Sequence, residues 1–253
     1  MQVAGIRAGK PWQRDWAMRT LGYFEGAHGT ICVIEDKATG ARRYYEGNAF
    51  QSHALPSGES CFTYIHLMNN LLRSAENVLL LGCAGGTLAT MLHRQGKTVT
   101  LVDHNPLSFR LAQEYFWMPR GIRCVVADFK GFLEEANGRF DGIAVDIGGP
   151  EFRFGDAFGL STCRALRRAL TQSGRIAMNL LVEHDLDPLP DQITADLAEP
   201  NLNAWIIDEA FGEPERNTII ACAPEHRLEL EHDSFPAVIA AEFSSWSVRR
   251  PRL

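Results

Sequence analysis

The sequence predicts an α/β fold: a largely parallel β-sheet of seven strands with helices on both faces, preceded by a small antiparallel β domain. Three observations support this prediction. Five apolar runs of strand length alternate with helical stretches, two further apolar runs follow with only a short turn between them, and residues 30–56 form short alternating runs. Because the five runs are apolar throughout, they are typical of strands that are buried on both faces.

The composition is that of a globular protein with one main domain and a small appendage. The chain has 253 residues, 45% hydrophobic and 22% charged, with a formal net charge of −6. This charge argues against nucleic acid as a partner. No apolar stretch reaches the roughly 18 residues that a membrane span needs, no signal-peptide-like run is visible, and the six cysteines lack metal-ligand spacing. We expect a cytoplasmic protein with mostly buried, reduced thiols, no membrane contact and no metal.

The predicted N-terminal β domain covers residues 1–60. Within it, the runs TICVIE, ARRYY and AFQSHALP are separated by Asp, Asn and Gly, which predicts an antiparallel hairpin and a third strand. The larger domain covers residues 61–253. It begins with residues 61–75, where apolar side chains recur at helical spacing.

The five runs of the predicted parallel sheet are NVLLLG, TVTLVD, CVVAD, FDGIAVD and GRIAMNLL. Two later runs, NAWIID and NTIIACA, are joined by the turn-like FGEPER and would close the sheet as an antiparallel pair. In such a sheet, ligands bind over the carboxyl ends of the strands, near the point where the strand order reverses. The polar groups that follow each strand are therefore candidate site residues.

The first strand ends in a glycine-rich loop, LGCAGGT, that contains Gly82, Gly85 and Gly86 and leads into a helix. Glycines let the backbone turn sharply and approach a ligand closely, and a helix N-terminus offers free N–H groups. A tight strand-to-helix turn needs glycine with or without a ligand, so the loop alone is a moderate signal.

Acids end the next three strands. Asp103, 21 residues after Gly82, could accept hydrogen bonds from both hydroxyls of a ribose. Asp128 could accept the amino group of an adenine, while Phe129 packs on the ring. Either aspartate could instead cap the following helix. Asp146 borders a second glycine-rich segment, where it could act as a base, hold a cation or be a turn residue. Helix capping does not require an acid at every strand end.

With these residues, the chain resembles the spermidine synthase-like proteins of the polyamine aminopropyltransferase family. That family joins a small N-terminal β domain to a Rossmann-like, methyltransferase-type domain, and the resemblance runs from about residue 30 to residue 223. Gln51 matches its cofactor-contacting Gln, and Phe62 and Tyr64 match the F-x-Y of its D-E-F-x-Y motif. Residues 81–87 lie on its G-G-G-D-G-G-T loop and Asp146 on the first Asp of D-S-S-D-P.

The resemblance implies a transferase acting on a small-molecule amine or another small acceptor, and a homodimer. It implies that Asp146 deprotonates the attacking amine, with Tyr64 beside it. S-adenosylmethionine or decarboxylated S-adenosylmethionine would be the group donor. The residues implied to bind it are Gln51, Gly82, Ala84, Gly85, Gly86, Asp103, Asp128 and Phe129.

The chain departs from the family at several acids. The residues that stand where the family has carboxylates are Ala84, Gly149, Ser60, Cys61 and His66. A polyamine carries two or more positive charges, and a site that removes it from water needs carboxylates to compensate them. Glu59, Glu151 and Asp156 in nearby loops could supply them.

Three functions remain open. The first is aminopropyl transfer to an amine. The second is methyl transfer to a small molecule, favoured because a carboxylate at position 84 would repel that of intact S-adenosylmethionine, and because LGCAGG is similar to the methyltransferase L-G-C-G-x-G. The third is a nucleotide-binding homologue without activity. An NAD dehydrogenase is disfavoured because LGCAGG departs from G-x-G-x-x-G. Phe152, Phe154 and Phe158 would form an aromatic wall for the acceptor, or pack a loop onto the core.

Overall fold

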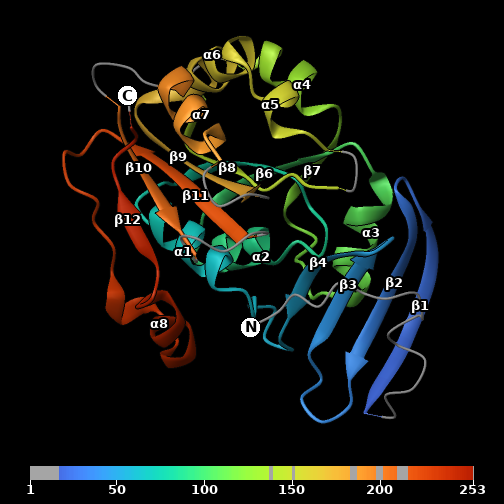
Figure 1. Cartoon of the computed structure of the whole chain (residues 1–253). Helices are drawn as coiled ribbons and strands as arrows, with labels where there is room; N and C mark the ends of the chain where they lie inside the picture. Colours follow the sequence, from blue (N-terminus) through green and yellow to red (C-terminus); the bar gives the residue numbers. More distant parts are fainter. Residues whose placement is uncertain are drawn as a thin grey trace.

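Two sheets organise the part of the chain that the computed structural model describes, which is residues 17–136, 139–149, 152–182, 187–197, 202–209 and 216–252. One is a four-stranded antiparallel sheet near the N-terminus, and the other is a mixed sheet of eight strands. Figure 1 shows the small sheet standing beside one end of the large one. Glu151 and most of the turn predicted over residues 211–216 lie outside the described residues.

The N-terminal sheet has one strand more than the sequence predicted. Its strands pair in chain order and are β1 (Met18–Gly26), β2 (Gly29–Asp36), β3 (Arg42–Glu46) and β4 (Ala49–Ala54). The strand that the prediction missed is β1. Its pairing with β2 shifts register between Thr20 and Gly22. An irregularity of this kind breaks the two-residue alternation by which a strand is recognised.

The N-terminal sheet packs on α3 (Pro106–Tyr115), the helix that follows β6. Tyr44 and Ile31 are fully buried in the cluster that they form with Leu111. At the edge, Nη1 of Arg42 donates to the carbonyl oxygen of Tyr115 over 2.6 Å, and its guanidinium lies 4.4 Å from the ring centroid of Trp117. These contacts hold the sheet against the end of the large sheet where β6 leads into α3.

The large sheet has eight strands among the described residues, where the sequence predicted seven. The strands are β5 (Asn77–Leu81), β6 (Thr98–Asp103), β7 (Arg123–Val126), β8 (Phe140–Val145), β9 (Leu170–Val182), β10 (Asn203–Asp208), β11 (Arg216–Ala223) and β12 (Ser247–Arg249). Their order is β12-β10-β11-β9-β8-β5-β6-β7. The five strands β5 to β9 are parallel, and β10 and β11 form the predicted antiparallel pair. The eighth, β12, has three residues, too few for a recognisable pattern.

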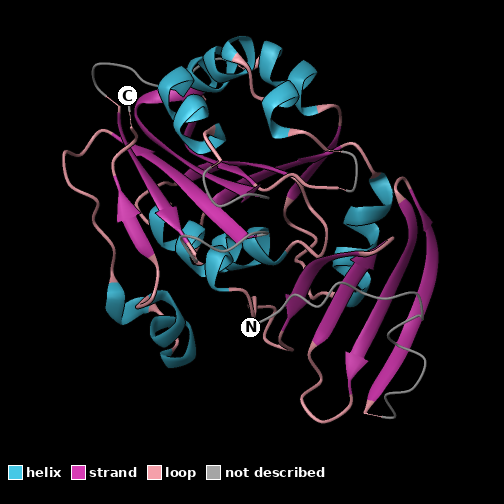
Figure 2. Cartoon of the chain, in the orientation of Figure 1, coloured by secondary structure: helices cyan, strands magenta, loops and turns pink. Residues whose placement is uncertain are grey.

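Helices cover both faces of this sheet, as Figure 2 shows. One face carries α1 (Thr63–Leu71), α2 (Thr87–Arg94) and α8 (Ala237–Phe243), and the other carries α4 (Phe129–Glu135), α5 (Phe154–Ala157), α6 (Leu160–Ala169) and α7 (Leu189–Leu197). Successive side chains of β5 enter opposite cores: Leu80 packs in the first and Leu79 in the second, both buried. This two-sided burial explains why the strands are apolar throughout.

The strand order reverses between β5 and β8, because β6 and β7 lie on one side of β5 while β8 and β9 lie on the other. Ligands of doubly wound sheets bind in the crevice that such a reversal opens. Here the loops after the two strands touch. A Cβ on Gly82 (φ +98) would lie 2.1 Å from the carbonyl oxygen of Asp146, so glycine is needed for both its conformation and its size.

Within the described ranges, no helix is both long and apolar enough to cross a bilayer, and no three His, Cys, Asp or Glu side chains gather into a potential metal site. All six cysteines are free, and four of them are buried. Burial raises the pKa of Cys163 to about 11, so this thiol is protonated at neutral pH.

Candidate functional site

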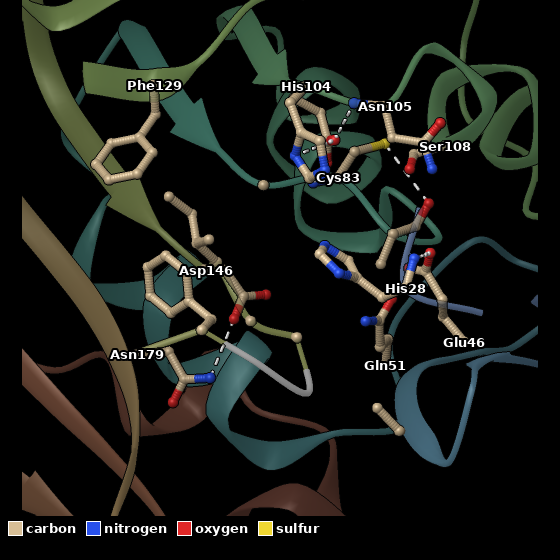
Figure 3. Close-up of a pocket in the computed structure, with 18 of the residues that line it drawn as sticks. His28, Glu46, Gln51, Cys83, His104, Asn105, Ser108, Phe129, Asp146 and Asn179 are labelled. Carbon is tan, nitrogen blue, oxygen red and sulfur yellow. Dashed lines mark hydrogen bonds and ion pairs between the residues drawn. The ribbon is translucent and has the colours of Figure 1, made fainter. Parts of the chain in front are cut away.

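A cavity of about 410 Å³ opens along the carboxyl ends of the parallel strands. Six strands of the large sheet contribute to its wall. In sheet order, their polar and glycine residues there include Asp128 after β7, Asp103 on β6, Gly82 after β5 and Asp146 after β8, followed by Asn179 on β9, with Leu181 on the same strand, and Asn217 on β11. We call the part at Gly82, Asp103 and Asp128 the β7 side, and the part at Asn179, Leu181 and Asn217 the β11 side. Asp146 lies between them. Opposite the strand ends, the N-terminal sheet contributes His28, Glu46 and Gln51 (Figure 3).

The structure brings eight of the ten predicted site residues into this wall: Gln51, Tyr64, Gly82, Ala84, Asp103, Asp128, Phe129 and Asp146. The two that lie outside the wall are Gly85 and Gly86. The N–H of Gly85 donates to Oγ of Ser52 over 3.0 Å, and a Cβ on Gly86 would lie 2.6 Å from Sδ of Met118. A Cβ on Gly85 would lie 2.8 Å from that of Ser52, so both glycines allow close packing within the protein.

Asp103 is held by the backbone of the two loops beside it. Its Oδ2 accepts the N–H of Cys83 over 2.9 Å and its Oδ1 accepts the N–H of Asn105 over 2.8 Å. Burial raises the pKa of Asp103, and these hydrogen bonds oppose that effect. The N-cap of α3 is Asn105 and not Asp103. Each oxygen of Asp103 keeps a second acceptor site, so the carboxylate can accept two neighbouring hydroxyls.

Asp128 does cap a helix: its Oδ2 accepts the N–H of Gly131 over 3.0 Å at the start of α4. It also lines the cavity. The capping interpretation thus holds without excluding contact with a ligand, because Oδ1 is not used by this bond.

The aromatic wall predicted for the acceptor is continuous with the β7 side. Phe129 stacks on Phe158 with centroids 5.3 Å apart and lies 6.4 Å from Phe152. Phe152 and Phe154 line the cavity, whereas Phe158 is 1% exposed and supports them from the core. A flat ring could lie against this wall at the end nearest Asp128.

Asp146 stands at the centre of the cavity. Its Oδ1 accepts Nδ2 of Asn179 over 3.0 Å, as Figure 3 shows. Burial raises the pKa of Asp146 to about 6, although the bond from Asn179 lowers it. Tyr64 reaches the cavity from α1, and burial, with the charges of Asp146 and Glu209, holds the pKa of its hydroxyl well above the usual range. At neutral pH the site thus pairs an ionised carboxylate that can accept a proton with a neutral phenol.

The positions where the family's acids are missing fall into two groups. Ser60, Cys61 and His66 lie outside the cavity wall, where Nε2 of His66 is hydrogen-bonded to the carbonyl oxygen of Ser60 over 2.7 Å. Ala84 and Gly149 do line the cavity. Ala84 has φ 44, and a Cβ at Gly149 would lie 3.5 Å from the imidazole of His28. At Ala84 and Gly149, the cavity wall therefore lacks two carboxylates that the family has.

Of the loop acids considered as replacements, the two that the structure describes do not supply the missing carboxylates. Glu59 is exposed and bonds to Ser57, and Asp156 lies in α5; neither lines the cavity. Among the described residues, the carboxylates of the wall are those of Glu46, Asp103, Asp128 and Asp146.

Several residues of the cavity were not found from the sequence. The N-terminal sheet supplies Glu46, whose Oε1 accepts the N–H of His28 over 3.0 Å, and the ring of His28 lies 5.7 Å from that of His104. Arg153, Ser108 and Asn217 also line the cavity. Only Asn179 carried a signal: it is the single polar residue in the run IAMNLL, near the carboxyl end of its strand.

In sequence, the chain matches no family model and no curated protein. Its structure is similar to that of a probable spermidine synthase from Corynebacterium glutamicum, with 17% identity, a TM-score of 0.77 and coverage of 91% of this chain and 90% of that one. A spermidine synthase in complex with the transition-state analogue AdoDATO gives 16% identity, a TM-score of 0.62 and coverage of 89% and 88%. Human methyltransferase-like protein 13 in complex with SAH gives 20% identity, a TM-score of 0.51 and coverage of 74% of this chain and 87% of that one.

These comparisons establish the fold. The chain is an α/β protein with a methyltransferase-type sheet, and it carries an N-terminal antiparallel sheet in addition. Its fold is spermidine synthase-like over nine tenths of its length, which confirms the resemblance predicted from the sequence motifs.

Proposed function

We propose that this protein is a transferase that binds decarboxylated S-adenosylmethionine on the β7 side of the cavity and transfers its aminopropyl group to an amine beside Asp146. The observation that carries the proposal is the place of Asp146. It lies at the reversal of the strand order, next to Gly82, and burial raises its pKa to about 6. The spermidine synthase-like fold supports the same class of reaction.

In the proposed reaction, the amine nitrogen attacks the methylene carbon next to the sulfonium. The new C–N bond forms as the C–S bond breaks, and the electron pair of that bond goes to sulfur, which leaves as methylthioadenosine. The proton lost by the amine goes to the carboxylate of Asp146, which Asn179 holds in place. Because the sulfonium already provides the electrophile, the protein contributes mainly positioning and charge stabilisation.

The nucleotide would be held by residues that follow successive strands. Asp103 would accept the two ribose hydroxyls, and Asp128 would accept the adenine amino group through its remaining oxygen. Phe129 and Phe152 would lie against the ring. Gln51 would approach the nucleotide from the N-terminal sheet.

Methyl transfer from intact S-adenosylmethionine is the second candidate, and Ala84 is the observation that favours it. This residue lines the cavity at the glycine-rich loop without a carboxylate. Such a wall would not repel the carboxylate of the intact nucleotide.

Calorimetric titration with methylthioadenosine, decarboxylated S-adenosylmethionine and intact S-adenosylmethionine, followed by turnover with amines, tests the proposal. We expect the decarboxylated form to bind tightest and to yield methylthioadenosine when an amine is present. A preference for the intact form, with methylated product, would replace aminopropyl by methyl transfer. Binding of none of the three would overturn both candidates.

A further inference from the structure

The N-terminal sheet places one histidine over the strand ends. His28 lies in the turn between β1 and β2, and it lines the cavity. Figure 3 shows its ring pointing into the cavity. The residue is exposed, so a ligand that enters the cavity can contact its side chain.

A buried carboxylate holds the turn that carries His28. Glu46 is 5% exposed, and its Oε1 accepts the N–H of His28 over 3.0 Å. A Cβ on Gly26 would collide with the same oxygen, so the carboxylate reaches the turn only because glycine stands there. A hydrogen bond to a charged acceptor is roughly twice as strong as one between neutral groups. The protein itself thus fixes the backbone of His28.

The ring of His28 bridges the two loops that border the reversal of the strand order. Its centroid lies 5.7 Å from that of His104, which follows Asp103 at the end of β6. On the other side, a Cβ on Gly149, in the loop after β8, would lie 3.5 Å from its Cδ2. Because β6 and β8 lie on opposite sides of β5, the ring spans the crevice in which doubly wound sheets bind their ligands.

The proposed function places the sulfur of the donor in this crevice. The ribose would lie at Asp103 and the reacting carbon near Asp146, so the sulfonium that joins them would lie between the two carboxylates, where the ring of His28 crosses. Aromatic rings attract cations through their electron-rich faces, and a neutral imidazole also carries an unprotonated nitrogen. A sulfonium is positively charged, whereas the thioether of methylthioadenosine is neutral.

From this arrangement, and resting on the proposed position of the nucleotide, we infer that His28 is a specificity-determining residue that contacts the sulfonium of the donor. Its ring covers the sulfur from the side of the N-terminal sheet and makes the site prefer a charged sulfonium to a neutral thioether. The contact holds the donor more tightly than the product, because methylthioadenosine has lost the charge. It would serve methyl transfer equally, since intact S-adenosylmethionine carries the same sulfonium.

The test compares two nucleotides that differ only at sulfur, S-adenosylmethionine and S-adenosylhomocysteine, each in its intact and its decarboxylated form. They are titrated calorimetrically into the protein and into His28→Leu at about pH 8, where histidine side chains are mostly neutral. We expect the variant to lose about three- to thirtyfold of the preference for the sulfonium, as one cation–π contact would give, and to bind the thioethers within about threefold of the parent. Equal losses for both nucleotides, or no loss for either, would overturn the inference.

Two further variants separate the contact from a general effect on structure. His28→Lys puts a positive charge at the same place, so it should weaken sulfonium binding more than His28→Leu does. His93 on α2 also packs on a glycine of another segment, because a Cβ on Gly121 would lie 3.5 Å from its ring, but it lies outside the cavity wall. His93→Leu should leave the preference unchanged. A lysine variant with the preference of the parent would contradict the contact.

Failure of the inference and failure of the proposed function give different results. Loss of the sulfonium preference in His28→Leu, without transfer of an aminopropyl group to any amine, would overturn the proposed reaction and support the contact. Transfer with a preference that does not depend on His28 would support the reaction and overturn the contact. Binding of none of the nucleotides would overturn both.

Discussion

Asn179 donates a hydrogen bond from Nδ2 to Oδ1 of Asp146 over 3.0 Å, and so joins the interior of β9 to the end of β8. An ionised carboxylate only accepts hydrogen bonds, so the amide nitrogen must face it. The bond orients Asp146 and favours its charged form, which opposes the effect of burial. Asn179 is thus a positioning residue that acts on the reaction through the base.

Replacing Asn179 tests this role. Leucine has a similar volume but cannot donate, so in Asn179→Leu the pKa of Asp146 should rise above its value of about 6. A hydrogen bond to a charged group contributes about 1.5–3 kcal/mol, which corresponds to a displacement of at least about one pH unit. The acid limb of the kcat profile should move to higher pH by that amount.

The matched control is Asn203→Leu. Asn203 also donates its amide nitrogen, to the carbonyl oxygen of Pro224 over 3.1 Å, but it lies on β10 outside the cavity wall. Its pH profile should coincide with that of the parent. An unchanged profile in Asn179→Leu would mean that the bond does not control the base.

Asp146→Asn should reduce kcat by about 100-fold or more, because general base catalysis typically contributes that much. Nucleotide affinity should stay within about threefold of the parent, since the neutral amide retains the shape of the side chain. A variant with full activity would show that another group accepts the proton.

The same substitution makes a prediction about stability. Burial raises the pKa of Asp146 from 3.8 to about 6 in the folded protein. The protonated carboxyl therefore contributes stability that is complete below about pH 4 and is lost as the pH rises through about 6. Asp146→Asn should unfold at a higher Tm than the parent at pH 7.5, with the difference becoming small near pH 4. A difference that does not change with pH would contradict the raised pKa.

The sequence predicted the strand-end acids because a parallel sheet places all carboxyl ends at one edge, whatever the details of packing. Asp103, Asp128 and Asp146 could therefore be placed at this edge because each of them ends an apolar run of strand length. His28 and Glu46 could not be found in this way. Their position over the cavity depends on how the N-terminal sheet packs on α3, through contacts such as Arg42 with Tyr115, which are 73 residues apart in the chain.

Asp103→Asn should weaken nucleotide binding by about 100-fold. The carboxylate has four acceptor sites, of which two take the N–H groups of Cys83 and Asn105. An asparagine would turn its NH₂ toward one of these donors and could no longer accept two hydroxyls. Calorimetric titration with methylthioadenosine measures the loss.

Asp141→Asn is the control for this experiment. Asp141 also accepts two backbone N–H groups, from Glu76 over 3.0 Å and from Asn77 over 2.8 Å, but it lies at the opposite end of the strands. This variant should lower Tm and leave the affinity unchanged when titrated well below Tm. Equal losses of affinity in both variants would indicate a general loss of structure rather than a contact with the nucleotide.

Gly82→Ala should be far more damaging than the same change at Gly96. Both glycines have left-handed backbone conformations, with φ +98 and φ +84, but a Cβ on Gly96 meets open space whereas one on Gly82 meets the carbonyl oxygen of Asp146 at 2.1 Å. The conformation alone costs about 1–2 kcal/mol, which lowers Tm by a few degrees in a domain of this size. At Gly82 the loops after β5 and β8 must also separate, so we expect a decrease of about 10 °C or more and loss of transfer activity. Thermal unfolding of the two variants side by side measures the contribution of this contact, and equal decreases in Tm would show that the approach of the two loops does not limit stability.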